Sequence, residues 1–222
     1  MTWLPAIPIN NNMPSPNVAV PRRPSSRGSG TSAAAFAALL LFSVFSSSSE
    51  GAEIAGMRID RETRVGGHHL VLNGAGLRQK FMVSVYILGL YTPEHTTVPE
   101  TVMALTGTRR ISLTFMRDVT AEALIEALHE GIRDNTSEAE LARVKGAAEA
   151  LAAVMKPLKI AKKGDTVALD YLPDKGSQVI MNGQPVGKAV PGQELYRALL
   201  RIWLGHRPVD PDLKRALLAG AP

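Results

Sequence analysis

The stretch Phe81-Met-Val-Ser-Val-Tyr-Ile-Leu-Gly-Leu-Tyr91 decides the fold, because it has the pattern of a β-strand that is apolar on both faces. Successive side chains of a strand point to opposite faces of its sheet. The two faces carry, respectively, Phe81, Val83, Val85 and Ile87, and Met82, Ser84, Tyr86 and Leu88. Apolar groups on both sides are typical of a strand inside a sheet that is covered on both faces.

Other strands are predicted on either side of this stretch. Residues 53–72 have β character, with Val65-Gly-Gly-His-His69 as the turn between 54–59 and 70–72. Residues 110–115 alternate, and their apolar side chains Ile111, Leu113 and Phe115 are expected to point inward. Further strands are predicted over 166–172 and 178–181. The Asn182-Gly183 pair that follows them is typical of a tight hairpin turn.

Four helices complete the pattern. The first is capped by Asp118 or Thr120 and has an apolar stripe through residue 132. The second opens with the capping box Ser137-Glu-Ala-Glu140 and stops at Pro157. The others are predicted over 193–204 and 211–219. Because helices and strands are segregated along the chain, the sequence indicates the α+β class, with an antiparallel sheet and helices on one face.

The first 52 residues are interpreted as a leader rather than as part of the fold. Residues 1–31 are rich in Pro, Ser, Asn and Gly, which predicts disorder. An apolar run over 33–45 is shorter than the roughly 20 residues of a membrane span. Basic residues precede it and small residues follow, which predicts a signal peptide over about 22–52, cleaved between Ser47 and Ala52, and a periplasmic or secreted protein. Open alternatives are an uncleaved anchor, a twin-arginine signal at Arg22-Arg23 and a start at Met13.

Composition narrows the classes of function. The remaining residues, 53–222, have the length of one domain, which we expect to be a monomer without a stable membrane span. The absence of cysteine excludes disulfides, thiolate catalysis and thiolate metal sites. The net charge of +5 is scattered, so no nucleic-acid partner is expected. No metal site is predicted, because the adjacent His68 and His69 would point to opposite faces of a strand. No cofactor is predicted either, because Gln79 stands where the loop after Gly74-Ala-Gly76 would need a third glycine to bind a dinucleotide.

Five segments together resemble the bacterial branch of the chalcone-isomerase-like family. They are Leu72-Asn-Gly-Ala-Gly-Leu-Arg-Gln-Lys-Phe81, Val85-Tyr-Ile-Leu-Gly-Leu-Tyr91, Phe115-Met-Arg-Asp-Val-Thr120, Lys163-Gly-Asp165, and Ala198-Leu-Leu-Arg-Ile-Trp-Leu-Gly205 with Pro208-Val-Asp-Pro-Asp-Leu-Lys214. The resemblance implies an open-faced β-sandwich, in which a curved antiparallel sheet is backed by a helical layer with a ligand cleft between them. Members of this fold either close a flavanone ring or bind a fatty acid.

The resemblance also implies candidate ligand-binding residues, which are Arg78, Tyr86 and Thr114. Arg78 is similar to the cleft arginine of both groups, and a guanidinium stays charged when buried and matches a carboxylate. Tyr86 stands where the isomerases have a catalytic threonine and the fatty-acid binders a tyrosine, and its phenol can bond a carboxylate. Gly74 and Gly76 would let a ligand or another strand approach closely.

The remaining isomerase positions are not matched by suitable side chains. The resemblance places Thr120, Ala127 and Ile202 where the isomerases have a tyrosine, an asparagine and a threonine. Since aliphatic groups cannot polarise a carbonyl, we expect a protein that binds an apolar acid without catalysis, and no catalytic residue is assigned. Two alternatives stay open. They are an intramolecular lyase, or isomerase, on an unknown substrate, and a structural or interaction protein with a collapsed cleft.

Overall fold

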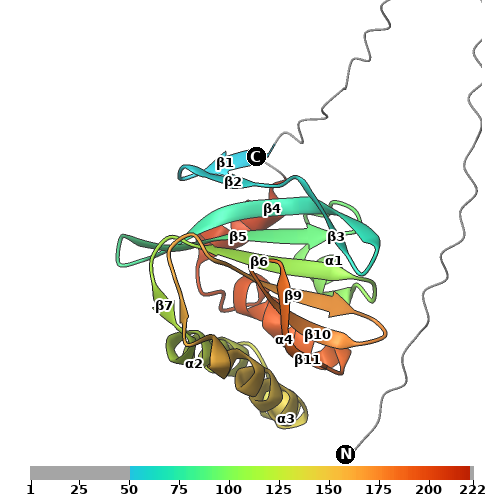
Figure 1. The fold of residues 1–222 in the computed structure, drawn as a ribbon. Coiled ribbons are helices and arrows are strands. Elements are labelled where there is room, and N and C mark those ends of the chain that lie inside the picture. The colour runs from blue at the N-terminus through green and yellow to red at the C-terminus, as the bar shows by residue number, and fades with distance from the viewer. Residues whose placement is uncertain (1–50, 221–222) are drawn as a thin grey trace, which may run out of the picture. The chain divides into compact units, whose positions relative to one another are not determined.

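The computed structural model of the chain describes residues 51–220, and its centre is a seven-stranded antiparallel sheet (Figure 1). In spatial order the strands are β11 (Gln184–Val190), β10 (Gly176–Met181), β9 (Thr166–Leu172), β6 (Arg109–Phe115), β5 (Val83–Thr92), β4 (His68–Lys80) and β3 (Glu62–Val65). β5 lies inside this sheet, with β6 on one side and β4 on the other. The predicted interior strand and the α+β class are confirmed.

Helices gather on one face of the sheet (Figure 1). The four longest are α2 (Ala121–Asp134), α3 (Glu138–Met155), α4 (Gln193–Leu204) and α5 (Pro211–Leu218). Short connecting elements are α1 (Pro99–Ala104), a 3-10 turn η1 (Lys156–Leu158), and the paired strands β7 (Val119–Thr120) and β8 (Ile160–Ala161). The main core lies between these helices and the sheet, and it contains all the predicted inward residues of β6.

The opposite face has a smaller core. The hairpin of β1 (Ala52–Ile54) and β2 (Met57–Ile59) contributes Ala52 and Ile59 to it, which pack with Leu72 and Ile87 of the sheet. β5 therefore has buried apolar groups on both faces, as its pattern predicted. Residues 1–50, which hold nearly all of the predicted leader, lie outside the described part, so the leader stays a prediction. Within residues 51–220, no helix is long and apolar enough to cross a membrane.

Local signals place the helix ends as expected. The Thr120 hydroxyl accepts the amide of Ala123 at 3.2 Å, so Thr120 rather than Asp118 caps α2. At the start of α3, Ser137 and Glu140 form the predicted capping box in both directions. The Asn182-Gly183 turn between β10 and β11 has positive φ angles of 49° and 80°, as a two-residue hairpin turn requires.

The hairpin of β4 and β5 corrects two predicted boundaries. β4 does not end at Leu72 but continues to Lys80, which pairs with Val83. Phe81 and Met82, expected as the first residues of the strand, form the turn instead, with φ of 51° and 65°. The long strand was missed because its middle, Asn73–Gly76, lacks the apolar alternation on which strand prediction depends.

Gly74 and Gly76 allow α5 and the residues after it to pack closely against β4. A Cβ on Gly76 would stand 2.8 Å from the Cβ of Ala216 and 2.9 Å from Leu213 Cδ1. At Gly74 it would meet backbone atoms of α5. The buried Asn73 side chain donates to the Leu217 carbonyl at 2.8 Å. The two glycines thus form a notch in β4 that seats α5, and Gly74 also forms a parallel bridge with Gly220, so the close approach expected here is made by the C-terminal segment of the chain.

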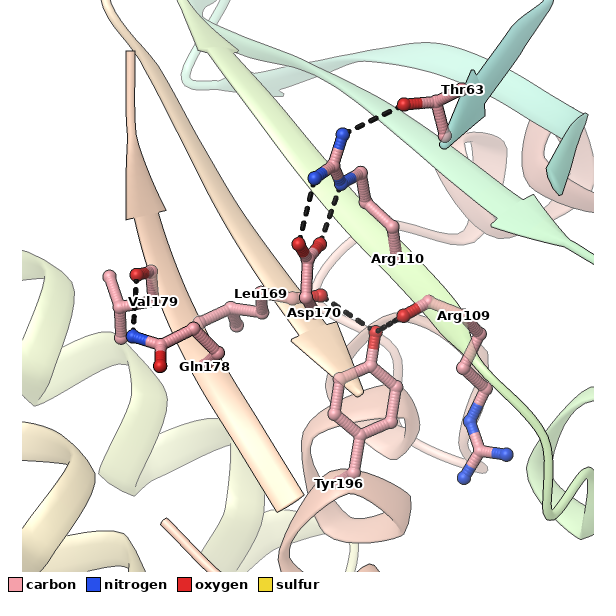
Figure 2. A network of polar contacts seen from close by, with 8 residues as sticks. All are labelled: Thr63, Arg109, Arg110, Leu169, Asp170, Gln178, Val179 and Tyr196. Carbon is pink, nitrogen blue, oxygen red and sulfur yellow. Dashed lines mark hydrogen bonds and ion pairs between the residues drawn. The ribbon is translucent and has the colours of Figure 1, made fainter. Parts of the chain in front are cut away.

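Two successive arginines of β6 stabilise the sheet from opposite faces (Figure 2). Arg110 donates to both carboxylate oxygens of Asp170, at 2.6 and 2.7 Å, and to the Thr63 hydroxyl. The Arg109 guanidinium is buried and lies 4.6 and 5.1 Å from the ring centres of Tyr171 and Tyr196. Because the Tyr196 hydroxyl donates to the Leu169 carbonyl at 2.8 Å, this cluster ties α4 to the sheet.

Candidate functional site

A small cavity of about 80 Å³ lies between the sheet and the helices. Three strands, three helices and the segment before α5 supply its lining, which consists of Tyr86, Leu113, Phe115, Leu124, Ala127, Leu128, Met155, Val167, Leu169, Ile202, Trp203 and Val209. Tyr86 and Trp203 are the only lining residues with a polar group. Ala127 is exposed, while Leu124 and Val209 are partly exposed, so these residues mark the mouth of the cavity.

Tyr86 and Trp203 meet at the polar end of this cavity. The Tyr86 hydroxyl accepts a hydrogen bond from Trp203 Nε1 at 2.9 Å, and its ring meets Phe115 edge to face at 6.2 Å between centres. Burial raises the pKa of Tyr86, an effect opposed by the Trp203 hydrogen bond and by the Arg78 charge. The phenol therefore stays protonated at neutral pH. Because its oxygen already accepts from Trp203, its own proton is free to reach an acceptor.

Arg78 lies directly beside Tyr86, because the two residues are paired across β4 and β5. Its Nη1 lies 3.4 Å from Asp210 Oδ2 and also donates to the Gln79 carbonyl. The Arg78 side chain is 18% exposed and that of Asp210 is 16% exposed, so the pair sits at the surface edge of the site. The structure thus brings Arg78 and Tyr86 together, next to the cavity but with an internal carboxylate already opposite the arginine.

Asp210 has two roles, one for each carboxylate oxygen. Its Oδ1 accepts the amides of Asp212 and Leu213 at 3.0 and 3.1 Å, which caps α5. Its Oδ2 faces Arg78. Sequence reasoning missed this second role and also missed Trp203 as a partner of Tyr86. An Asp before a Pro signals the start of a helix, but nothing in that signal identifies a partner 132 residues away.

Thr114, the third candidate, does not join this group. It pairs with Ile87 and Thr166, and so lies on the opposite face of the sheet from its neighbours Leu113 and Phe115, which line the cavity. The alternation of side chains along β6 allows no other arrangement. Thr114 is therefore placed away from the cavity by the same pattern that places Phe115 in it.

Of the three positions that the resemblance aligns with isomerase side chains, two line the cavity and one does not. Ala127 and Ile202 both line the cavity, where neither can give or take a proton. Thr120 instead uses its hydroxyl to cap α2. Among residues 51–220, no three His, Asp or Glu side chains come close enough to hold a metal ion. The chemistry available at the site is that of a cation and a phenol beside an apolar space.

Comparison with known proteins agrees with the fold. The sequence profile of the chalcone isomerase-like family matches residues 51–219. A search of curated protein sequences finds no match. The crystal structure of a fatty-acid binding protein from Arabidopsis thaliana is similar, with a TM-score of 0.57 at 16% identity, over 76% of this chain and 96% of that chain. The profile covers the whole sheet and all the helices described above, and the chain belongs to the chalcone isomerase-like family.

Proposed function

We propose that the domain binds an apolar carboxylate, such as a fatty acid, without catalysing a reaction. The acyl chain enters the cavity between sheet and helices, and the carboxylate takes the place of Asp210 opposite Arg78. The observation that carries the proposal is the direct pairing of Arg78 with Tyr86 at the polar end of an otherwise apolar lining. A guanidinium and a protonated phenol are both donors, which suits a carboxylate.

The size of the cavity determines how such a ligand would enter. At about 80 Å³ it is smaller than the roughly 300–1,000 Å³ of typical small-molecule sites. A long acyl chain therefore requires the lining to move. Leu124 at the mouth and the flexible side chain of Met155 are the groups whose rotation would lengthen the cavity. We expect a wider cavity in the bound protein than in the structure described here.

The lining also supports binding rather than catalysis. General acid–base catalysis needs a group whose pKa lies near the working pH. Tyr86 is the only titratable residue in the lining, and burial raises its pKa further from neutrality. The chalcone isomerase-like fold by itself specifies no activity, because one fold can host both enzymes and binding proteins.

Titration of the purified full-length chain with palmitate tests the proposal. In a Trp3→Phe background, Trp203 is the remaining tryptophan, and its fluorescence reports the cavity directly. We expect saturable binding that Arg78→Ala weakens by roughly tenfold to a hundredfold, the effect of losing a charge-assisted hydrogen bond. The matched control is Arg64→Ala, an exposed arginine on β3 that pairs with His69, near the other end of β4.

Two results would reject this function. One is equal affinity of the parent and of Arg78→Ala for palmitate. The other is turnover of a chalcone above the rate in solution and abolished by Arg78→Ala, which would instead establish the intramolecular lyase alternative.

We further propose that the protein acts outside the cytoplasm. The support is the order of basic, apolar and small residues over about 22–52. Expression in a Gram-negative host followed by mass measurement of the periplasmic fraction tests this. A chain that begins between residues 48 and 53 is expected. An uncut chain that stays with the membrane or in the cytoplasm would contradict the proposal.

A further inference from the structure

The turn between β4 and β5 exposes apolar side chains more fully than any other described part of the chain. Phe81 is 90% exposed, Met82 is 94% exposed and the next residue, Val83, is 47% exposed. Scattered exposed apolar residues are normal, but two large ones in succession at the tip of a protruding hairpin form a local apolar point. Phe81, Met82 and Val83 together form this apolar tip.

Neither packing nor backbone preference explains this choice of residues. Both turn positions have positive φ, a conformation that favours glycine or asparagine over residues with bulky side chains. The chain itself offers the comparison, because the β10–β11 hairpin uses Asn182 and Gly183 at equivalent positions. Phe81 and Met82 thus occupy an unfavourable conformation while contributing almost no buried surface to the fold.

Basic side chains surround the apolar tip. Lys80 and Arg117 line the same surface hollow as Phe81, and the Lys80 ammonium lies 6.0 Å from the centre of the Phe81 ring. The adjoining β8–β9 loop adds the exposed Lys162 and Lys163. This loop is held beside the hollow because the Lys163 amide donates to Asp118 at 2.8 Å.

Two acids lie among these cations, and both already accept hydrogen bonds. Asp118 accepts from the Lys163 amide, as described above. Asp165 accepts from the Lys162 amide at 2.8 Å and from Asn182 Nδ2 at 3.0 Å. The hollow and the β8–β9 loop together therefore carry three lysines, one arginine and two aspartates. This leaves a net positive charge around the apolar tip.

We propose that the apolar tip inserts into an anionic lipid bilayer, with the surrounding basic residues on the headgroups. Apolar residues that enter the interface and cations that meet anionic lipids are the two components of peripheral membrane binding. A protein partner fits less well, because a two-residue point is far smaller than the roughly 1,200 Å² of a specific protein interface. Docking of a second copy of this chain on the same tip would also bring the basic residues of the two copies together. The inference stands independently of the ligand proposed above.

The position of the tip connects the docking to the proposed ligand, although the docking itself does not rest on that ligand. Val83 begins the same strand that carries Tyr86 three residues further on, or roughly 10 Å along the strand. An inserted tip would therefore hold the polar end of the cavity close to the headgroup region, where the carboxylate of a membrane-derived acid lies.

Vesicle binding measured at the tip itself tests the inference. In a Trp3→Phe background, Phe81→Trp places a fluorophore there, and the same protein without that change supplies the Trp203 signal for subtraction. With vesicles that are one-third phosphatidylglycerol in phosphatidylcholine, we expect a blue shift and strong quenching by brominated acyl chains. Val98→Trp, at another exposed apolar position in the loop before α1, should show neither.

A second variant removes the tip without harming the fold. Phe81→Asn with Met82→Gly installs the residues that this turn prefers, so the hairpin should form at least as well. We expect it to weaken vesicle binding by roughly tenfold or more, given the loss of two apolar side chains. Lys162→Gln with Lys163→Gln should weaken binding to the anionic vesicles alone. The matched control is Lys175→Gln with Lys188→Gln, two exposed lysines on β9–β10 and β11.

Three results would overturn the inference. The first is fluorescence of the Phe81→Trp protein that vesicles leave unchanged. The second is vesicle binding unaffected by the Asn-Gly replacement. The third is sedimentation that shows self-association lost in that variant, which would make the tip a contact between copies. Palmitate titration of the same variant in solution should match the parent, so a failure here is distinct from a failure of the ligand proposal.

Discussion

Two arginine–aspartate pairs in this molecule differ in geometry. We assign one of them to the stability of the fold and the other to the proposed ligand site. Arg110 and Asp170 face each other in the register of β6 and β9, and two nitrogens meet two oxygens at 2.6 and 2.7 Å. The Asp170 side chain is 5% exposed. Arg78 meets Asp210 at 3.4 Å through one nitrogen, and its partner comes from the segment before α5 rather than from the sheet.

The comparison shows what each arginine is free to do. A bidentate pair fixed by strand register satisfies both partners, so neither is available to a ligand. A longer contact at the edge of a cavity gains less, and in the proposed function an incoming carboxylate replaces it. We therefore expect substitutions at the two pairs to have different effects. At Arg110 and Asp170 they should lower stability, and at Arg78 and Asp210 they should change the affinity for the ligand.

The largest effect is expected from Asp170→Ala. Removing one partner of a buried pair leaves Arg110 uncompensated, which costs about 3–5 kcal/mol. Urea denaturation followed by circular dichroism measures this loss as a lower midpoint at an unchanged slope. Asp210→Ala serves as the contrast, with a cost of about 1 kcal/mol from its cap, because its contact with Arg78 is a single long one at 3.4 Å whose loss costs little. Equal losses in the two variants would contradict the distinction between the pairs.

The next largest effect concerns the shape of the Arg78 side chain. Arg78→Lys keeps the charge but not the planar fork, so palmitate affinity should fall by about tenfold while the free energy of unfolding changes by less than about 1 kcal/mol. Calorimetric titration and urea denaturation of one preparation give both values. An affinity equal to that of the parent would show that charge alone acts at this position.

A smaller effect of opposite sign is expected at Asp210. Asn keeps the cap of α5 but removes the carboxylate that competes for Arg78. Asp210→Asn should therefore bind palmitate more tightly, by about 1 kcal/mol or roughly fivefold. Asp212→Asn, an exposed acid on the first turn of α5, is the control. Weaker binding by Asp210→Asn would show that Asp210 assists the ligand instead of competing with it.

The smallest effect is expected at a third ion pair, in which Arg201 Nη1 lies 3.0 Å from Glu140 Oε1. Both side chains are partly exposed. The Ser137 amide, and then Arg201, lower the pKa of Glu140 from 4.5 to about 2. Because the pKa of Glu140 is lower in the folded than in the unfolded state, its carboxylate stabilises the folded state when the pH is above about 4.5. This contribution disappears as the pH falls from about 4.5 to about 2. Solvent screening keeps it below about 1 kcal/mol.

Glu140→Gln tests that contribution. The stability difference between parent and variant should be present at neutral pH and should shrink through this acid range, as thermal unfolding at several pH values would show. A difference that does not vary with pH would assign the effect to the capping box alone.

Much of the fold was predictable because its signals are local. β6 alternates strictly between buried and partly exposed residues, and Ser137 with Glu140 marks a helix start within four residues. The central part of β4 was not predictable in this way. Its buried Asn73 is satisfied by the carbonyls of Leu217 and Thr96, which the neighbouring sequence does not reveal.

The candidate site was likewise predictable where its residues lie in short motifs, and not where its contacts join distant parts of the sequence. Arg78 and Tyr86 were named through the family resemblance, and strand pairing brings them together. Trp203 and Asp210 contact them across 117 and 132 residues of sequence, and no periodicity encodes such contacts. Thr114 was misplaced for the opposite reason, because the alternation of β6 that puts it on the far face was already visible.

The glycine notch of β4 has a consequence for the order in which the molecule assembles. α5 completes both the notch and the Arg78 pair, yet Asp210 follows Arg78 by 132 residues. At about 5–20 residues per second of synthesis, β4 exists for several seconds or more before that helix emerges. Until then the notch and the Arg78 guanidinium both lack the partners that α5 and its capping residue supply.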